Sequence, residues 1–590
     1  MRRAFAVSFA LAVSWLCATA QESTSVPDRI AGIWASEQLF GPRVGGTLAI
    51  DARGSEWHAR IAGFDVPVQR NGNEVRFLLP SAQGEFRGHV STDAKAIVGH
   101  WIQPASSIFS QRYATPVDLR EIAKSAWQGQ VVPLPERISF YFSIHKTGDG
   151  ITAVVRNPEF GWFNGRYQVQ VNDKAIVLSN GGGQLQGTYD AATDALSFLL
   201  LNGSAAPVVL TRRNNTNATA LVPRVGHQHE TYAYAPPLPE SDGWETGSLT
   251  DAGLDPKPVT TLLQSILDAD PDDPKAVAIH SILIARHGKL VLEEYFYGFD
   301  AARTHDMRSA GKTLGTILIG VARDHGAKVE PSTPLSAVFA RYKPFSNWDD
   351  RKARITVENA MTMTPGLACD DNDNNSPGQE NTFQSQTQQP DWYKYALDLP
   401  MARDPGGTAA IYCSASLNLT GGVAQEASGR WNADLFYDFI ARPLQFATYH
   451  LNLMPTGQVY TGGGAYIRPR DQLKLGQVYL SKGMWNGRRI VSAAWVEQST
   501  ATHSGFARPV VETDLNHQYG YGWHIHHFSV NGHEYREYAA EGAGGQMVMV
   551  LPELDLVVAV SAGDYRSGNW YRWMLEILPK YIIPAATTAR

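Results

Sequence analysis

The segment His305-Asp-Met-Arg-Ser-Ala-Gly-Lys312 runs into an apolar stretch of helical periodicity, and it decides the fold and chemistry expected of this chain. A serine hydroxyl is a weak nucleophile at neutral pH, and a lysine three residues further along a helix projects from the same face. The spacing therefore predicts a nucleophile at Ser309 with Lys312 as the neighbouring base. Asp324-His-Gly326 supplies a helix stop, and the residues that mark the helix face are Leu314, Ile317, Leu318 and Val321.

A helix start at Ser309 also suits the reaction. Backbone N–H groups and the helix dipole at this end favour the negative charge that develops on an attacked carbonyl. The same four-letter pattern occurs at Ser143-Ile-His-Lys146, inside an alternating run typical of a strand. A period of two sends Ser143 and Lys146 to opposite sides, so this second copy is expected to be a decoy.

Length and charge set the outer limits. The chain has 590 residues and a formal net charge of -6, which predicts two or three domains and gives no basic patch for nucleic acid. Residues 1–20 are typical of a secretory signal peptide, with Arg2-Arg3, an apolar run to Cys17 and the small residues Ala18-Thr-Ala20. We expect cleavage before Gln21, no lipid anchor at Cys17, and a periplasmic or secreted protein. No later apolar run is long enough to span a membrane.

Export leaves two cysteines, Cys369 and Cys413, in the mature chain. In an oxidising compartment a single pair favours a disulfide, and two separate buried thiols are the alternative. Cys413 directly follows Tyr412, a residue that matters below.

The first half is expected to be all-β, barrel-like or sandwich-like. It is rich in glycine and short alternating runs, with turn signals such as Asn71-Gly72. An echo of Gly84-Glu-Phe-Arg-Gly88 in Gly183-Gln-Leu-Gln-Gly187 suggests a duplication. The expected divisions are 21–120 for the first β unit, 121–213 for the second and 214–242 for a linker.

Helices and strands alternate over residues 243–590, which predicts an α+β domain with an antiparallel sheet flanked by helices. The expected elements are a helix over 258–267, a hairpin over 280–295, a hairpin around Pro552-Glu-Leu-Asp555 and a terminal helix from about 569 to 581.

This half resembles the serine β-lactamase-like hydrolases, which include class C β-lactamases, D,D-peptidases, esterases and oligoamide hydrolases. The resemblance covers about residues 243–580. It rests on four motifs in the family's order: His305 to Lys312, Ile411-Tyr-Cys-Ser414, Gly462-Gly-Gly464 leading to Pro469-Arg-Asp-Gln-Leu473, and Gly542-Ala-Gly-Gly-Gln546.

The resemblance implies a role for each matching residue. Ser309 would carry the acyl group, and Lys312 and Tyr412 would carry protons, with the choice of base between them left open. The backbone N–H groups of Ser309 and Ala543 would form the oxyanion hole. Gly542 would leave room for the acyl group. Ser414 and Gly544 would complete the substrate-binding set.

Two positions depart from the penicillin-recognising members. Ser414 stands where they have asparagine, and a hydroxyl can still orient a substrate amide or the lysine. Ala540, followed by Glu541, stands where they have lysine or histidine, which removes the cation that would bind a substrate carboxylate. A neutral ester or amide is therefore expected before a β-lactam or a D-alanyl peptide.

Two patterns invite a metal. His524 and His526 share one face of the strand in His524-Ile-His-His527, but no third ligand is evident from the sequence. Asp371-Asn-Asp-Asn-Asn375 begins like a calcium loop, yet Ser376 and Thr382 occupy the positions of its glycine and glutamate. We expect no metal and no cofactor, so a chelator should leave activity intact.

The expected protein is an exported serine hydrolase acting on a small-molecule or peptide-like acyl substrate. The alternatives are a β-lactamase or D,D-peptidase and, in another class, an inactive binding module in which Ser309 merely caps a helix and Tyr412 is a core aromatic. The β half would contact cell wall or glycan, cap the cleft or assist oligomerisation.

Overall fold

The computed structural model describes residues 26–587 except for short stretches. These are 42–43, 54–55, 107–110, 149, 202–205, 215–216, 227–229, 271, 274–275, 507–516, 566–570 and 572. The expected signal peptide, with Cys17, lies outside the described residues, as does the start expected for the terminal helix. No helix in the described part is both long and apolar enough to cross a membrane.

The first of two N-terminal sheets is a closed barrel. Its core is aromatic and aliphatic, with Trp34, Phe142 and Phe198 buried inside it, and α1 (Val26–Ile30) precedes its first strand. The strands, in order around the barrel, are β1 (Gly32–Leu39), β11 (Arg137–Thr147), β12 (Gly150–Arg156), β13 (Gly165–Asn172), β14 (Ala175–Asn180), β15 (Gly183–Asp190), β16 (Ala195–Phe198) and β17 (Val208–Arg213).

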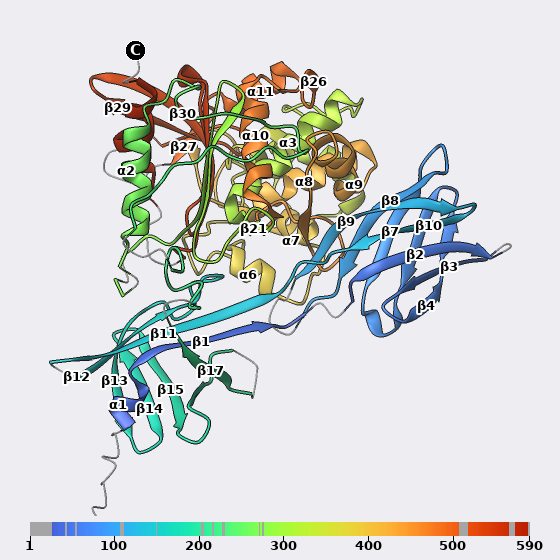
Figure 1. Cartoon of the computed structure of the whole chain (residues 1–590). Helices are drawn as coiled ribbons and strands as arrows, with labels where there is room; N and C mark the ends of the chain where they lie inside the picture. The colour runs from blue at the N-terminus through green and yellow to red at the C-terminus, as the bar shows by residue number, and fades with distance from the viewer. Residues whose placement is uncertain are drawn as a thin grey trace, which may run out of the picture.

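The second N-terminal sheet curls around Trp101, Phe86 and Phe77. Its strand β9 (Arg112–Ala123) also pairs with β23 (Tyr449–Leu453) of the C-terminal half, so the sheet continues into that half (Figure 1). The short strands β21 (His305–Asp306) and β24 (Tyr466–Ile467) follow β23 in this sheet, and its other strands are β2 (Gly46–Arg53), β3 (Glu56–Ile61), β4 (Phe64–Pro67), β5 (Gln69–Asn71), β6 (Glu74–Leu78), β7 (Glu85–Val90), β8 (Ala96–Gln103) and β10 (Ala126–Val131).

The all-β prediction for this half is confirmed, but the strands do not divide at residue 120. β9 runs through that position and β10 pairs with both β9 and β2. β1, which comes first in the chain, closes the barrel by pairing with β11 and β17. β1 covers the edges of β11 and β17 that would otherwise be exposed. This gives a physical reason why β1 pairs with strands that come much later in the chain.

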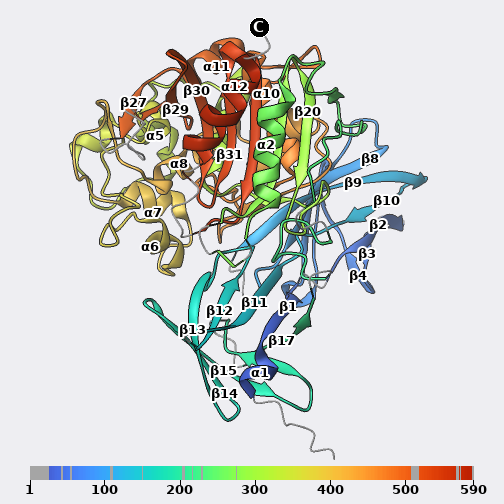
Figure 2. The ribbon, with the colours of Figure 1, turned by 60° about the vertical axis from the view of Figure 1, so that its left-hand side comes forward.

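A ten-stranded sheet with helices on both faces forms the C-terminal half, as predicted (Figure 2). Successive side chains along a strand point to opposite faces of this sheet, so each face packs against its own hydrophobic core. Met547 and Met549 of β31 face the core beneath α2, whereas Val548 and Val550 face the core that holds α3 and α10. Sheet order is β18 (Glu245–Thr246), β20 (Lys289–Tyr295), β19 (Ile279–Arg286), β32 (Leu556–Ala562), β31 (Gln546–Leu551), β30 (His533–Gly542), β29 (His524–Val530), β28 (Gln518–Tyr519), β27 (Ser504–Phe506) and β22 (Ala409–Ala410).

The predicted hairpins, β19 with β20 and β31 with β32, are confirmed. The helix expected over 258–267 is α2 (Pro256–Leu267). The other helices are α3 (Lys312–Asp324), α4 (Leu335–Val338), α5 (Val357–Met361), α6 (Glu380–Ser385), α7 (Trp392–Asp398), α8 (Ser414–Ser428), α9 (Asn432–Phe436), α10 (Pro469–Leu480), α11 (Ala493–Thr500), the π-helix η8 (Trp573–Ile582) and α12 (Ile583–Thr587).

The expected linker over 214–242 has neither helix nor strand in its described part, yet it is anchored to the C-terminal half. Its last residues meet α10, where the Arg470 Nε donates to Asp242 Oδ2 at 2.8 Å. Tyr232 N donates to the side chain of Gln264 in α2 at 2.7 Å. A segment without periodicity is thus held in place by polar contacts.

Candidate active site

Ser309 and Lys312 occupy the junction of two short elements. Ser309 lies in the 3-10 turn η2 (Arg308–Gly311), which runs straight into α3 at Lys312. The Lys312 Nζ donates to Ser309 Oγ at 2.8 Å and to the Gly462 carbonyl at 2.7 Å. Lys312 is buried at 1% exposure, whereas Ser309 is half-buried and faces a cavity. The structure therefore brings the predicted pair into direct contact.

The other serine and lysine of the same pattern are separated. Ser143 is buried in the barrel strand β11 and its hydroxyl contacts His145 Nε2 at 2.7 Å. Lys146 is exposed and forms an ion pair with Asp28. Strand geometry thus separates this serine from the lysine.

Tyr412 completes the group around Ser309. It directly precedes the N-cap of α8, and its hydroxyl is hydrogen-bonded to the Ser309 side chain. The Lys312 Nζ lies 4.9 Å from the centroid of the Tyr412 ring. Lys312 and Tyr412 therefore both interact with the side chain of Ser309.

The predicted disulfide between Cys369 and Cys413 is present, with the two Cα atoms 5.5 Å apart. Beside it, Asp371 N donates to the Tyr412 carbonyl at 2.9 Å. The bridge and this hydrogen bond hold the loop that carries Asp371 against the chain that carries Tyr412.

Ser414 is placed differently from its expected role. It is fully buried, and both its backbone N and its hydroxyl donate to Asp371 Oδ2 at 2.7 Å. Asp371 rather than Ser414 lines the cavity. The loop that begins like a calcium site therefore presents Asp371 to the cavity wall, with one of its oxygens engaged by Ser414.

Gly542 ends β30 against the nucleophile turn. A Cβ atom there would lie 2.3 Å from the Met307 carbonyl oxygen and 2.9 Å from the Ala310 nitrogen. The sequence predicts that the glycine makes room for an acyl group. In the structure, the missing side chain makes room for the close approach of η2, the turn that carries Ser309. Ala543, the expected second oxyanion donor, follows at the cavity wall. Gly544 lies in the turn to β31, against the Tyr565 ring.

The cavity in front of Ser309 has a volume of about 780 Å³. The cavity is lined by the expected residues and also by acidic side chains that the sequence motifs did not predict. Ala540 points into the core, and Glu541 takes the place at the wall. The acidic residues concerned are Asp370, Asp371, Glu380 and Glu541.

Burial and charge set the proton affinities around Ser309. Burial lowers the pKa of Lys312 below its usual 10.5, although the Glu380 and Asp371 carboxylates oppose the change. Burial raises the pKa of the Tyr412 phenol above its usual range. Burial, followed by the Glu380 charge, raises the pKa of Asp371 to about 6, against the opposing effect of Lys312. A neutral Lys312 amine is thus easier to form, and a Tyr412 phenolate harder to form, than in water.

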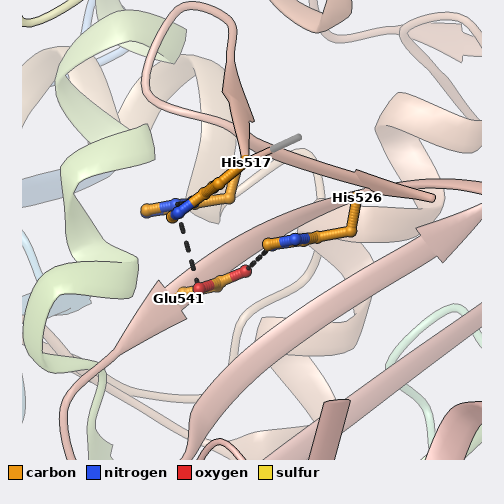
Figure 3. Close-up of side chains that lie close together, drawn as sticks. His517, His526 and Glu541 are labelled. Carbon is orange, nitrogen blue, oxygen red and sulfur yellow. Dashed lines mark hydrogen bonds and ion pairs between the residues drawn. The ribbon is translucent and has the colours of Figure 1, made fainter. Parts of the chain in front are cut away.

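A histidine cluster adjoins this group. His524 and His526 do share one face of β29, and folding adds His517 and Glu541, which sequence reasoning missed as partners. The His517 Nε2 lies 2.6 Å from His524 Nδ1, and the His526 Nε2 lies 2.6 Å from Glu541 Oε1. Figure 3 shows the rings of His517 and His526 turned toward the Glu541 carboxylate. His517 lies between β27 and β28 and Glu541 lies in β30, so only sheet pairing brings them together.

The N-terminal barrel reaches the back of the nucleophile turn. The Arg308 guanidinium lies 5.7 Å from the centroid of the Phe160 ring and 4.9 Å from that of Tyr565. Gly161, in the same barrel loop, packs on Tyr565 so closely that a Cβ atom would lie 2.7 Å from its Cβ. The residue next to Ser309 is therefore supported by the β half.

Known proteins show similarity to the C-terminal half of this chain. The sequence model of the Beta-lactamase family matches residues 274–569, which is half of the chain. The 6-aminohexanoate-dimer hydrolase of Paenarthrobacter ureafaciens is 22% identical over 310 residues, which are 50% of this chain and 76% of that protein. A solved β-lactamase from Mycobacterium bovis is 18% identical, with a TM-score of 0.37, and the match covers 53% of this chain and 96% of that one. Simvastatin synthase from Aspergillus terreus is 14% identical, with a TM-score of 0.44 and coverage of 57% and 99%.

The matched range contains the turn η2 with Ser309, Tyr412 and the β30–β31 hairpin. The chain therefore belongs to the Beta-lactamase family of serine hydrolases.

Proposed function

We propose that this protein is an exported hydrolase that cleaves a neutral ester or amide through an acyl-enzyme on Ser309. The observation that carries the proposal is the contact of Lys312 Nζ with Ser309 Oγ at 2.8 Å, with the Tyr412 hydroxyl on the same oxygen, at the wall of the cavity.

Lys312 is the proposed base. Its neutral amine donates a hydrogen bond to the Gly462 carbonyl and uses its lone pair to accept the Ser309 proton as Oγ attacks the substrate carbonyl carbon. The backbone N–H groups of Ser309 and Ala543 stabilise the oxyanion. Tyr412 then delivers a proton to the leaving alcohol or amine and recovers one by way of Lys312. Water discharges the acyl group by the same path in reverse.

The acidic side chains around the cavity support a neutral substrate. Glu541 lies at the wall where a penicillin-recognising enzyme would hold a cation, and Asp370, Asp371 and Glu380 add three more carboxyl groups. Burial on its own would raise the pKa of Glu541, but the imidazoles of His524 and His526 lower this pKa to about 2. An anionic β-lactam or a peptide carboxylate would be repelled there.

Export is supported by the signal-like residues 1–20 and by the disulfide, since such bridges persist in oxidising compartments. For the β half we propose a contact with cell wall or glycan. Its barrel loop also supports Arg308, so the same half helps to fix the nucleophile turn.

A hydrolysis panel tests the proposal. Chelator-treated protein is mixed with p-nitrophenyl esters of different acyl length, D-amino-acid amides and a chromogenic cephalosporin, and each initial rate is compared with that of Ser309→Ala. We expect turnover of an ester or amide that the variant abolishes. Faster turnover of the cephalosporin would select the β-lactamase alternative. A folded protein that turns over none of the panel and takes up no fluorophosphonate would instead support a binding module.

A further inference from the structure

The cluster of His517, His524, His526 and Glu541 is a compact set of ligand atoms at the edge of the active-site cavity. One atom from each side chain lies within 4.8 Å of all the others. Each of the four residues is at most 6% exposed. Burying four titratable groups together is costly unless they are hydrogen-bonded or bound to a metal, so the arrangement calls for a physical reason.

The donor set and its dimensions fit a metal ion. Imidazole nitrogens with a carboxylate oxygen are ligands that zinc takes in tetrahedral sites, at bond lengths of roughly 2.0–2.2 Å. Such bonds place neighbouring ligand atoms roughly 3.4 Å apart. The observed distances are 2.6 Å from His526 Nε2 to Glu541 Oε1, 3.8 Å from His524 Nδ1 to the other oxygen, Glu541 Oε2, and 2.6 Å from His517 Nε2 to His524 Nδ1, so they lie on either side of that value. Small side-chain movements would therefore complete a tetrahedron.

The chain also holds the ligands on a firm support and leaves a way in. His524 and His526 come from β29 and Glu541 from β30, and the two strands pair from His524 with Ala539 to Val530 with His533, so Glu541 lies two residues beyond the pair that Ala539 forms. His517, His524 and Glu541 line the cavity in front of Ser309, so an ion can enter through that cavity. Rigid strands, a matching ligand count and an entry path are the features expected of a built site.

We propose that His517, His524, His526 and Glu541 bind one divalent transition-metal ion, with zinc as the ion that this donor set fits best. Four protein ligands leave no open position, so the site is structural rather than a Lewis-acid site. The ion joins His517, which directly precedes β28, to the strands β29 and β30 and so fixes one wall of the cavity.

The proposed ion is separate from the acyl chemistry. None of Ser309, Lys312 and Tyr412 is a ligand, although the His524 ring stacks beside the Tyr412 ring with centroids 6.5 Å apart. Removing the metal is therefore expected to lower the melting temperature while Ser309 keeps its reactivity toward a fluorophosphonate. The Ser309→Ala variant is expected to bind metal as wild type does, so that failure of this proposal and failure of the hydrolase proposal can be told apart.

Metal binding can be measured on the full chain without reference to activity. Purified protein is stripped with a chelator, loaded with excess zinc, desalted and analysed by mass spectrometry for metal content. We expect about one equivalent of zinc per chain. Replacement by cobalt is expected to give the visible absorption bands of tetrahedral Co²⁺ with nitrogen and oxygen ligands.

Variants assign the ion to these ligands. His517→Ala, His526→Ala and Glu541→Gln are each expected to weaken zinc binding roughly 100-fold, since each removes one of four bonds. His527→Ala is the matched control, because His527 is on the same strand, is partly exposed and pairs instead with Glu534 at 2.6 Å. Circular dichroism checks that each variant is folded, and the cobalt spectrum of wild type stands even if one variant is not.

Two results would overturn the proposal. One is a wild-type protein that keeps less than roughly a tenth of an equivalent after loading, which would leave the four residues as a metal-free hydrogen-bonded network. The other is zinc binding that is unchanged in the three ligand variants or lowered equally in His527→Ala, which would place the ion elsewhere.

Discussion

Asp371 and Tyr412 are joined through their backbones: the N–H of Asp371 donates to the carbonyl of Tyr412 at 2.9 Å, directly beside the Cys369–Cys413 disulfide. The bond places a cavity carboxyl and a proposed proton carrier on one cross-linked unit. Both the stability of the domain and the chemistry at Ser309 are therefore expected to depend on that unit.

Loss of the disulfide is expected to destabilise the hydrolase domain. The bridge closes a loop of 44 residues, and in the chain-entropy model a loop of this size contributes about 4 kcal/mol to the free energy of unfolding. A double Cys369→Ser, Cys413→Ser variant should therefore melt well below wild type in differential scanning calorimetry. A reductant should lower the melting temperature of wild type only. Equal melting of the two proteins would contradict the structural role given to the bridge.

Lys312→Met is expected to lower kcat/KM roughly 100- to 10,000-fold, the usual contribution of a positioned proton carrier. Because burial lowers the pKa of Lys312, its neutral form gains population as pH rises toward a pKa below 10.5. In wild type, kcat/KM should therefore rise with pH along an acid limb whose midpoint lies below pH 10.5. The variant should lose that limb. Lys352→Met is the control, since Lys352 is equally buried but bonds to the carbonyls of Ser346 and Leu397. A limb that persists in Lys312→Met would assign the base elsewhere.

Asp371→Asn is expected to move the same limb to lower pH. The Asp371 carboxylate raises the pKa of Lys312, so removing its charge lowers that pKa and frees the amine at a lower pH. Asp373→Asn, an exposed change in the same loop, should leave the profile in place. A shift of the limb to higher pH in Asp371→Asn, or an equal shift in both variants, would contradict this electrostatic coupling.

Gly542→Ala is expected to reduce kcat roughly 100-fold, because the added Cβ would push on the Met307 carbonyl and displace the turn that carries Ser309. Gly181→Ala, where an added Cβ meets open space, should leave kcat unchanged. Comparing kcat of the two variants, with circular dichroism to verify folding, tests how closely β30 and the nucleophile turn depend on each other. Wild-type turnover by Gly542→Ala would show that the turn tolerates the displacement.

Local patterns predicted a good part of this structure. The helix after Ser309, both hairpins of the central sheet and the separation of Ser143 from Lys146 follow from periodicities of 3.6 and 2, which a short stretch of sequence already contains. The bridge between Cys369 and Cys413 followed from the expected compartment and from counting cysteines.

Long-range pairing explains most of what the sequence did not show. β1 closes a barrel whose other strands begin at residue 137, and β9 pairs with β23 more than 300 residues later. Asp371 reaches the cavity from a loop that begins like a calcium site and Glu380 from the start of α6, and His517 and Glu541 meet only through strand order. The spacing of residues along the sequence does not predict such long-range contacts.

The most direct test of the central claim is the mass of the intact protein after brief mixing with a p-nitrophenyl ester and acid quench. We expect a mass increase equal to one acyl group, mapped by peptide analysis to Ser309, present in wild type and in Ser143→Ala but absent in Ser309→Ala. An acyl group that maps to another residue, or that forms equally on folded Ser309→Ala, would contradict it.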